Sequence, residues 1–194
     1  MAVLTALLGV TIGSVAGYSG GTTDLVLSGL INLVLSVPAL PLAMVLGGFL
    51  QASVLFVIIV LSVVTWTGAA RLIRAEFLSL RSREYVLAAR VLGLDDTRII
   101  AQHMLPNVLG LIIVAATLQM SAAILAESAL SYLGFGVQPP TGSWGNMLQN
   151  AQRYFRTDPG LAMYPGILIA LTVSGVNFLG DGLRDAFDPR LRNR

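Results

Sequence analysis

The run "ASVLFVIIVLSVVTWTGAA", residues 52–70, contains no charged side chain and no alternation of polar with apolar positions. A helix needs about 20 residues to cross the hydrocarbon core of a bilayer, and this run is close to that length. Backbone polar groups must be paired inside lipid, which favours a helix, whereas a membrane-spanning strand would alternate in polarity. The run therefore predicts a transmembrane helix.

Four other stretches of the chain are also free of charged residues. Apolar residues make up 55% of the chain, charged residues 11%, and the mean hydropathy is +0.78, which is outside the range of a soluble domain of this length. We therefore expect an all-α polytopic membrane protein, a single transmembrane domain over residues 1–194 with about five spanning helices. The expected spans are residues 2–17, 31–50, 52–70, 107–126 and 161–180.

The first of these stretches does not have the composition of a cleaved signal peptide. No basic residue precedes it, and the first arginine of the chain is Arg71. It is also shorter than the other four stretches. We therefore expect that a first transmembrane helix precedes this sequence in the natural protein.

Arginine is distributed unevenly among the segments that connect the spans. Six of the twelve basic residues lie in the loop 71–106, four in the tail 181–194 and two in the segment 127–160. Cytoplasmic loops of membrane proteins carry an excess of basic residues. The loop 71–106 and the tail are therefore expected in the cytoplasm, and the segment 127–160 on the outer side of the cell membrane.

Two prolines, Pro38 and Pro41, lie inside the stretch 31–50. Proline lacks a backbone N–H and its ring clashes with the preceding turn of a helix. We therefore expect a kink in the second span.

The loop 71–106 contains a helical pattern. Four residues recur at the spacing of one helical face: Tyr85, Ala88, Ala89 and Leu92. Gly93 follows them, and glycine adopts the positive φ that ends many helices. We therefore expect a short helix that turns at Gly93.

A second short helix is expected after this turn. Asp95, Asp96 and Thr97 are typical caps of a helix N-terminus. Pro106 suits the first turn of the next span, because its missing N–H would have no partner there. The pattern predicts a compact projection on the cytoplasmic face. The residues leave open an alternative, an amphipathic segment lying on anionic lipid, which the arginines would also favour.

Three segments of the chain together resemble a known family: "WTGAARLIRAEFLSLRSREYVLAARVLG" (66–93), "LSYLGFGVQPPTGSWGNML" (130–148) and "NFLGDGLRDAFDPRLR" (177–192). They are similar to permease subunits of the dipeptide, oligopeptide and nickel family of ATP-binding-cassette importers. The likeness is to the second of that family's two permeases. It implies six helices in the complete permease, one more than expected here.

The loop 71–106 resembles the EAA loop of these permeases. Its matching residues are Ala88, Ala89, Gly93, Leu105 and Pro106. Leu87 stands where a glutamate is usual, and His103 where an isoleucine is usual. The resemblance implies a coupling helix that docks in a groove of an ATPase subunit. The docking residues that it implies are Glu84, Tyr85, Ala88, Ala89, Arg90, Gly93, Asp95, Asp96, Leu105 and Pro106.

The same resemblance implies the partners and the place of the protein. It implies a permease in the inner or plasma membrane of a prokaryote, which forms part of a pathway for peptides, or for nickel or a related small solute. The implied partners are a homologous second permease, two ATP-binding-cassette ATPases, an external substrate-binding protein and the lipid bilayer, with no nucleic acid. ATP and Mg²⁺ would be used by the ATPases, and this chain would bind no cofactor.

Two residue types are missing from the sequence. The chain has no lysine, so it cannot contain a P-loop, whose lysine holds the phosphates of ATP. It has no cysteine, so it has no thiolate metal site and no disulfide. We expect a transport subunit and not an enzyme, with no catalytic residues and no metal site.

The outer segment 127–160 combines aromatic residues with glycine and proline. Glu127, Tyr132, Phe135 and Trp144 are candidates for a pathway or an outer gate where an external binding protein docks. The alternative is an interfacial aromatic belt, with Glu127 reaching water at a helix end. For Glu127 itself we favour this alternative.

Two other functional classes are compatible with an apolar chain. An ATP-independent channel or facilitator would also span the membrane, and a stable complex with an ATPase would exclude it. An intramembrane enzyme would need a paired aspartate, an H-E-x-x-H motif or a serine with a histidine partner, and the spans contain none of these.

Overall fold

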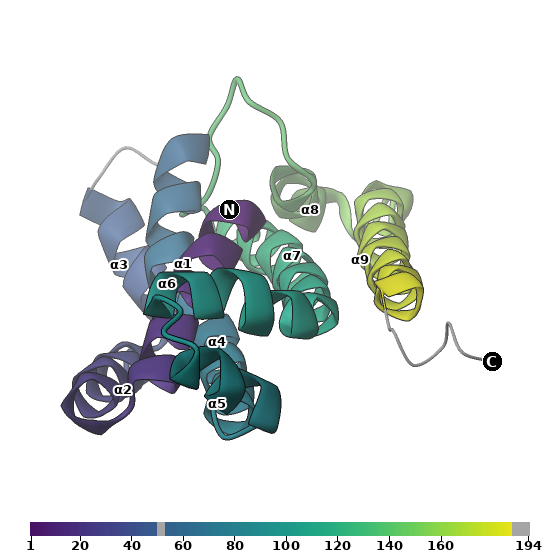
Figure 1. Ribbon diagram of the computed structural model, residues 1–194. Coiled ribbons are helices and arrows are strands. Elements are labelled where there is room, and N and C mark those ends of the chain that lie inside the picture. The colour runs from purple at the N-terminus through teal and green to yellow at the C-terminus, as the bar shows by residue number, and fades with distance from the viewer. Residues whose placement is uncertain (50–52, 188–194) are drawn as a thin grey trace. The chain divides into compact units, whose positions relative to one another are not determined.

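The computed structural model describes residues 1–49 and 53–187, and every regular element in these ranges is a helix (Figure 1). The prediction of an all-α chain is therefore confirmed. The α-helices are α1 (Ala2–Ser19), α2 (Gly21–Leu35), α3 (Ala39–Phe49), α4 (Val54–Leu80), α5 (Glu84–Val91), α6 (Asp96–Arg98), α7 (Leu109–Tyr132), α8 (Trp144–Ala151) and α9 (Gly160–Phe187), and the shorter elements are the π-helical turn η1 (Ile99–Met104) and the 3₁₀ turns η2 (Leu105–Val108) and η3 (Gln152–Tyr154).

Four helical stretches of the described chain are long and apolar enough to cross a membrane: Ala2–Ser19, Val54–Leu80, Asp96–Tyr132 and Gly160–Ala186. The pair α2 and α3, bent by 68°, adds a fifth if it counts as one broken span. About five spans were expected, and the structure gives four, or five with the bent pair. Their boundaries in a bilayer stay a prediction. The boundary expected at residues 50–52 and the tail from residue 188 lie outside the described residues.

The stretch 31–50 is divided between two helices, because α2 ends and α3 begins within it. Pro38 disfavours helical conformation in the residue before it and has no N–H to donate. Ser36 Oγ donates a hydrogen bond to the carbonyl of Leu33 at 2.7 Å, at the end of α2. The kink expected here is therefore a full break at Pro38. Pro41 does not add to it, since it lies in the first turn of α3, where a missing N–H leaves no bond unmade.

The chain divides into two compact units. Unit 1 comprises Met1–Ala2, Val37–Thr65 and Thr117–Leu179, and unit 2 comprises Val3–Ser36, Trp66–Ala116 and the stretch from Gly180. α4 and α7 each contribute residues to both units. The single transmembrane domain over residues 1–194 stays a prediction.

The core of unit 2 joins α1 and α4 to the loop that follows α4. Its buried members are Tyr18, Ile73, Phe77, Leu80, Val86, Ala89, Ile99, Met104 and Val108. Because side chains from the loop are buried together with those of two long helices, the loop is a packed part of unit 2. This packing argues against the alternative in which the loop lies on lipid as an isolated amphipathic segment.

α1 packs on the backbone of α4 through three glycines spaced four residues apart, Gly9, Gly13 and Gly17. A Cβ atom added at Gly13 would lie 2.5 Å from the carbonyl oxygen of Ala70, and one at Gly17 would lie 2.6 Å from that of Arg74. Only glycine fits at such distances, and small residues at this spacing allow close helix contact in membranes. α1 is therefore fixed against the part of α4 that leads into the loop.

Unit 1 has its own core. Its buried residues are Ala43, Val57, Leu61, Leu130 and Val137, from α3, α4, α7 and the segment after α7. The outer segment thus begins as a packed continuation of α7.

Replacing Gly13 with alanine should weaken the packing of α1 on α4, because the new Cβ would overlap a backbone oxygen. Overpacking of this kind costs about 1–3 kcal/mol. The matched control is Gly29→Ala in α2, where a Cβ would meet no heavy atom within 4 Å. Alanine is favoured over glycine in a helix by about 1 kcal/mol. Thermal unfolding in detergent should give a lower Tm for Gly13→Ala and an equal or higher Tm for Gly29→Ala. An unchanged Tm for Gly13→Ala would contradict the close contact.

Candidate functional site

α5 has one buried face and one exposed face. Val86 and Ala89 are 0% and 5% exposed and belong to the core of unit 2. Val91 and Leu92 are 87% and 78% exposed, and Tyr85 is 41% exposed. The buried face anchors α5, while the other face leaves apolar side chains uncovered. Clusters of exposed apolar side chains often mark interaction sites.

The helical pattern found in the sequence describes mainly the exposed face. Tyr85, Ala88 and Leu92 are exposed, whereas Ala89 is buried against the core. The four residues lie on one side of the helix, but the core covers Ala89 and leaves the other three exposed. Val86, three residues before Ala89, is buried with it and sets the buried side of α5.

The first turn of α5 carries a single acidic residue, Glu84. An acidic side chain at this position interacts favourably with the positive end of the helix dipole. Burial raises the pKa of the neighbouring Tyr85 phenol, and the positive charge of Arg83 only partly offsets this. Tyr85 therefore contributes a neutral group to the exposed face.

The turn after α5 requires glycine. Gly93 has a φ of 78°. Its N–H donates to the carbonyl of Arg90 at 3.0 Å, and the N–H of Leu94 donates to the carbonyl of Ala89 at 3.2 Å. These two bonds form a Schellman motif, which satisfies the last carbonyls of a helix. A Cβ at Gly93 would meet no heavy atom within 4 Å, so the requirement comes from the backbone and not from space. The expected turn at Gly93 is confirmed.

The acidic pair after the turn is divided between two roles. Asp95 is at the N-cap position of α6, and its carbonyl accepts the N–H of Ile99 at 2.9 Å. Its carboxylate accepts a hydrogen bond from the hydroxyl of Thr97 and caps no backbone N–H. The position expected for Asp95 is correct, and the side-chain cap is absent. Asp96 is turned toward α1 instead.

Tyr18, near the end of α1, connects three elements of unit 2. Its hydroxyl donates a hydrogen bond of 2.5 Å to Asp96 Oδ1 in α6. The guanidinium carbon of Arg90 in α5 lies 5.2 Å from the centroid of the Tyr18 ring, within the range of a cation–π contact. The ring is only 5% exposed. Arg90 and Asp96, which the family resemblance implied as docking residues, thus have a partner inside the chain.

The helix that contains Pro106 begins earlier than the sequence suggested. Helical structure starts at Asp96 and continues through η1 and η2 into α7, so Pro106 lies inside it and not in its first turn. The wide π-helical turn precedes Pro106, and such turns relieve the clash between a proline ring and an earlier carbonyl. Asn107 Nδ2 donates to the carbonyl of His103 at 2.6 Å. Leu105 packs against the core of unit 2.

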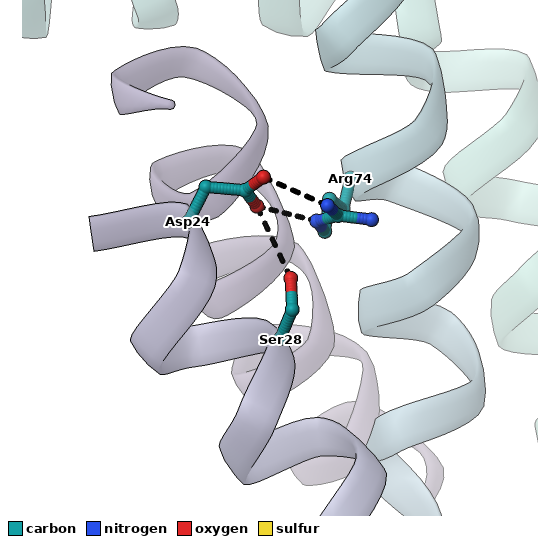
Figure 2. Close-up of polar contacts among 3 residues, drawn as sticks. All are labelled: Asp24, Ser28 and Arg74. Carbon is teal, nitrogen blue, oxygen red and sulfur yellow. Dashed lines mark hydrogen bonds and ion pairs between the residues drawn. The ribbon is translucent and has the colours of Figure 1, made fainter. Parts of the chain in front are cut away.

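Two of the arginines at the end of α4 bind polar residues of α2. Arg74 donates from Nε and Nη2 to the two carboxylate oxygens of Asp24, at 2.5 and 2.7 Å. Ser28 Oγ donates to the same carboxylate at 3.2 Å, and Figure 2 shows the three side chains together. Arg71 Nη2 donates to Asn32 Oδ1 at 3.2 Å. Arg71 and Arg74 therefore hold α2 against α4.

The four outer candidates come from α7, the segment after it and α8. Glu127 lies inside α7, which continues to Tyr132, so the expectation that it ends a helix is wrong. Its carboxylate accepts a hydrogen bond from Ser131 Oγ at 2.6 Å. Phe135 packs against the core of unit 1, Trp144 begins α8, and Tyr132 is 39% exposed. A gating role for these residues stays a prediction.

Within the described ranges, no three histidine, cysteine, aspartate or glutamate residues lie close enough to hold a metal ion. The polar contacts of unit 2 are structural pairs between helices. The feature of this site that remains without a partner in the described chain is the exposed apolar face of α5.

The amino-acid sequence matches the family described as binding-protein-dependent transport system inner membrane component over residues 9–193. It is 39% identical over 191 residues to the oligopeptide transport system permease protein OppC of Bacillus subtilis (strain 168). It is also 39% identical over 187 residues to the dipeptide transport system permease protein DppC of Alkalihalophilus pseudofirmus. These alignments cover 98% and 96% of this chain but 63% and 62% of the two relatives. The chain thus spans less than two thirds of their length.

The fold is similar to that of a chain in the inward-facing MetNI methionine ABC transporter, in its CY5 native crystal form. The TM-score is 0.70, and the match covers 97% of this chain and 91% of that chain at 20% sequence identity. At this level of identity the likeness concerns the fold alone.

Replacing Gly93 with valine should destabilise the turn after α5, because a β-branched residue does not adopt a positive φ readily. A left-handed conformation costs about 1–2 kcal/mol for a residue with a Cβ. Gly93→Asn is the matched control, since asparagine tolerates this conformation better. Limited proteolysis of the purified protein should cleave the loop 84–106 faster in Gly93→Val than in Gly93→Asn. Equal rates for the two variants would contradict the backbone requirement.

Proposed function

The chain belongs to the binding-protein-dependent transport system inner membrane components, and from this premise we propose that it is a permease subunit of an ATP-driven peptide importer. The family and several long apolar helices make it a multi-pass membrane protein. Peptide is the preferred cargo because two relatives are named for oligopeptide and dipeptide transport. Nickel or a related small solute is the alternative cargo.

The observation that carries this proposal is that α5 has an exposed apolar face and an opposite face buried in the core. Tyr85, Val91 and Leu92 are uncovered, while Val86 and Ala89 fix the helix to the core. A groove on an ATPase subunit would cover that face, and burying apolar area is favourable by about 25 cal/mol per Å². Ala88 and Glu84 would lie at the same contact.

We propose that the partner ATPase subunits, and not this chain, bind and hydrolyse ATP. The chain has no lysine and therefore no P-loop of its own. ATP and Mg²⁺ would be bound by two ATPase subunits, one of which docks on α5 of this chain. The second ATPase would dock on a homologous permease, which would complete the pathway across the membrane.

Movement of the ATPase would reach the membrane helices through the core of unit 2. Val86 and Ala89 of α5 share this core with Ile73 and Phe77 of α4, so α5 cannot shift freely by itself. Allosteric transitions commonly move packed elements as rigid bodies. A displacement of α5 would therefore move the adjoining part of α4.

The orientation in the membrane follows from the arginines. The loop 71–106 and the tail would face the cytoplasm of a prokaryotic cell, because they carry most of the basic residues. The segment 127–160 would face outward and receive an external substrate-binding protein. Glu127, Tyr132, Phe135 and Trp144 are the proposed residues of that outer surface.

An ATP-independent channel or facilitator is the competing function. It would share the membrane helices but would need no partner on α5. The contact between α5 and an ATPase is therefore the property that separates the two functions.

A single cysteine introduced at Val91 should crosslink to an ATPase subunit in membranes that contain the whole transporter. The chain has no native cysteine, and Val91 is 87% exposed, so the label would be specific. Phe155→Cys is the control, because Phe155 is 61% exposed and lies in the proposed outer segment. In vesicles that hold the permease without its ATPases, a membrane-impermeant maleimide should label Val91→Cys when the vesicles are inside-out and Phe155→Cys when they are right-side-out. The proposal fails if Val91→Cys is labelled from the outside or crosslinks to no other subunit.

The variant Gly93→Val should separate ATP hydrolysis from uptake, because a distorted turn would no longer hold α5 in register with the core. In proteoliposomes at a temperature where the variant is folded, hydrolysis should continue while peptide uptake falls. Gly93→Asn should keep most of the uptake. Undiminished uptake by Gly93→Val would count against a coupling role for the loop.

A further inference from the structure

Tyr18 of α1 contacts charged residues of both α5 and α6. It is buried in the core of unit 2, its hydroxyl donates to Asp96 of α6, and its ring faces the guanidinium of Arg90 of α5. One side chain from α1 thus contacts the elements on both sides of the Gly93 turn. The two contacts are directional, unlike the surrounding apolar packing.

The two charged partners of Tyr18 have opposite signs. The carboxylate of Asp96 accepts a hydrogen bond from the hydroxyl, and a hydrogen bond to an ionised acceptor is stronger than one between neutral groups. The cation of Arg90 is attracted to the negative face of the ring. Tyr18 therefore connects an anion and a cation through groups that are themselves neutral, and its ring stays almost fully buried.

α1 lies in close contact with α4 next to Tyr18. Gly17, the residue before Tyr18, lies so close to α4 that a Cβ there would be 2.6 Å from the carbonyl oxygen of Arg74. The ring of Tyr18 and the side chain of Phe77 share one core. Because protein interiors are close-packed, such a contact transmits displacement without a gap. Tyr18 is thus held firmly on the α1 side.

We propose that Tyr18 is the positioning residue through which a displacement of α5 and α6 moves α1. In this arrangement α1, the part of α4 after residue 66 and the loop through Val108 shift together. Without the hydroxyl, the apolar packing would remain, but α6 would lose its directional link to α1. This inference rests on the proposed function, since it assumes that an ATPase moves α5.

The role differs from that of the ion pair between Asp24 and Arg74. That pair connects α2 to α4 and touches neither α5 nor α6. Its loss would loosen α2 while leaving the link between the loop and α1 intact. The coupling path described here therefore passes through Tyr18 and not through the arginines of α4.

The test uses the complete transporter in proteoliposomes, with ATP hydrolysis and peptide uptake measured on the same preparation. Tyr18→Phe should lower the uptake per ATP about fivefold or more, the lower range of allosteric coupling, with hydrolysis nearly unchanged. Asp96→Ala should give the same loss. The double variant should be no worse than either single variant, because one hydrogen bond is removed in all three cases. Tyr164→Phe is the matched control, since Tyr164 is 69% exposed in α9, and it should change neither quantity.

Two results would overturn the inference. One is an unchanged uptake per ATP in Tyr18→Phe. The other is a parallel fall of uptake and hydrolysis together with a lower Tm, which would mean that Tyr18 only stabilises the fold. Failure of the proposed function is seen separately, because the wild-type transporter would then show no ATP-dependent uptake, or Val91→Cys no crosslink. A working wild type with an unaffected Tyr18→Phe variant would remove this inference alone.

Discussion

The contact of α1 with the backbone of α4 is the constraint on which unit 2 depends. Gly9, Gly13 and Gly17 let the two helices approach until a Cβ would overlap a carbonyl oxygen. In lipid, helix association depends on close packing, because the hydrocarbon chains are as apolar as the side chains they contact. The contact brings Tyr18 beside Phe77 and leaves room for the loop to add its own side chains to the same core.

The anchoring of the loop explains how a short helix can serve as a docking surface. An eight-residue helix is marginal by itself, because nucleation is costly and few bonds follow it. α5 is instead held by Val86 and Ala89 in the core, by the Schellman motif at Gly93 and by the contact of Arg90 with Tyr18. These interactions fix one face and leave the other available to a partner. A helix that passes on the movement of a partner must be held firmly on the face opposite the partner.

The arginines around the loop have a structural use as well as the proposed topological one. Arg74 pairs with Asp24, Arg71 with Asn32, and Arg90 lies over Tyr18. Counting arginines in the sequence indicates which side of the membrane the loop faces, but it does not show that these side chains bind other helices of the chain. Both uses are compatible, because a guanidinium near the membrane surface is stabilised by a polar partner at the same depth.

The sequence by itself determined the helical class, the set of four or five candidate spans, the turn at Gly93, a bend within the stretch 31–50 and the family resemblance. These features follow from local rules: apolar run length, the φ of glycine, the missing N–H of proline and short motifs. The tertiary structure alone decided which face of α5 is buried, that Tyr18 meets Asp96 78 residues away, and that Glu127 lies inside a helix. Such facts depend on which helices touch, and a pairing between distant residues leaves no periodic signal in one sequence. The sequence contains the glycine spacing of α1, but only the tertiary structure identifies α4 as the helix that packs on it.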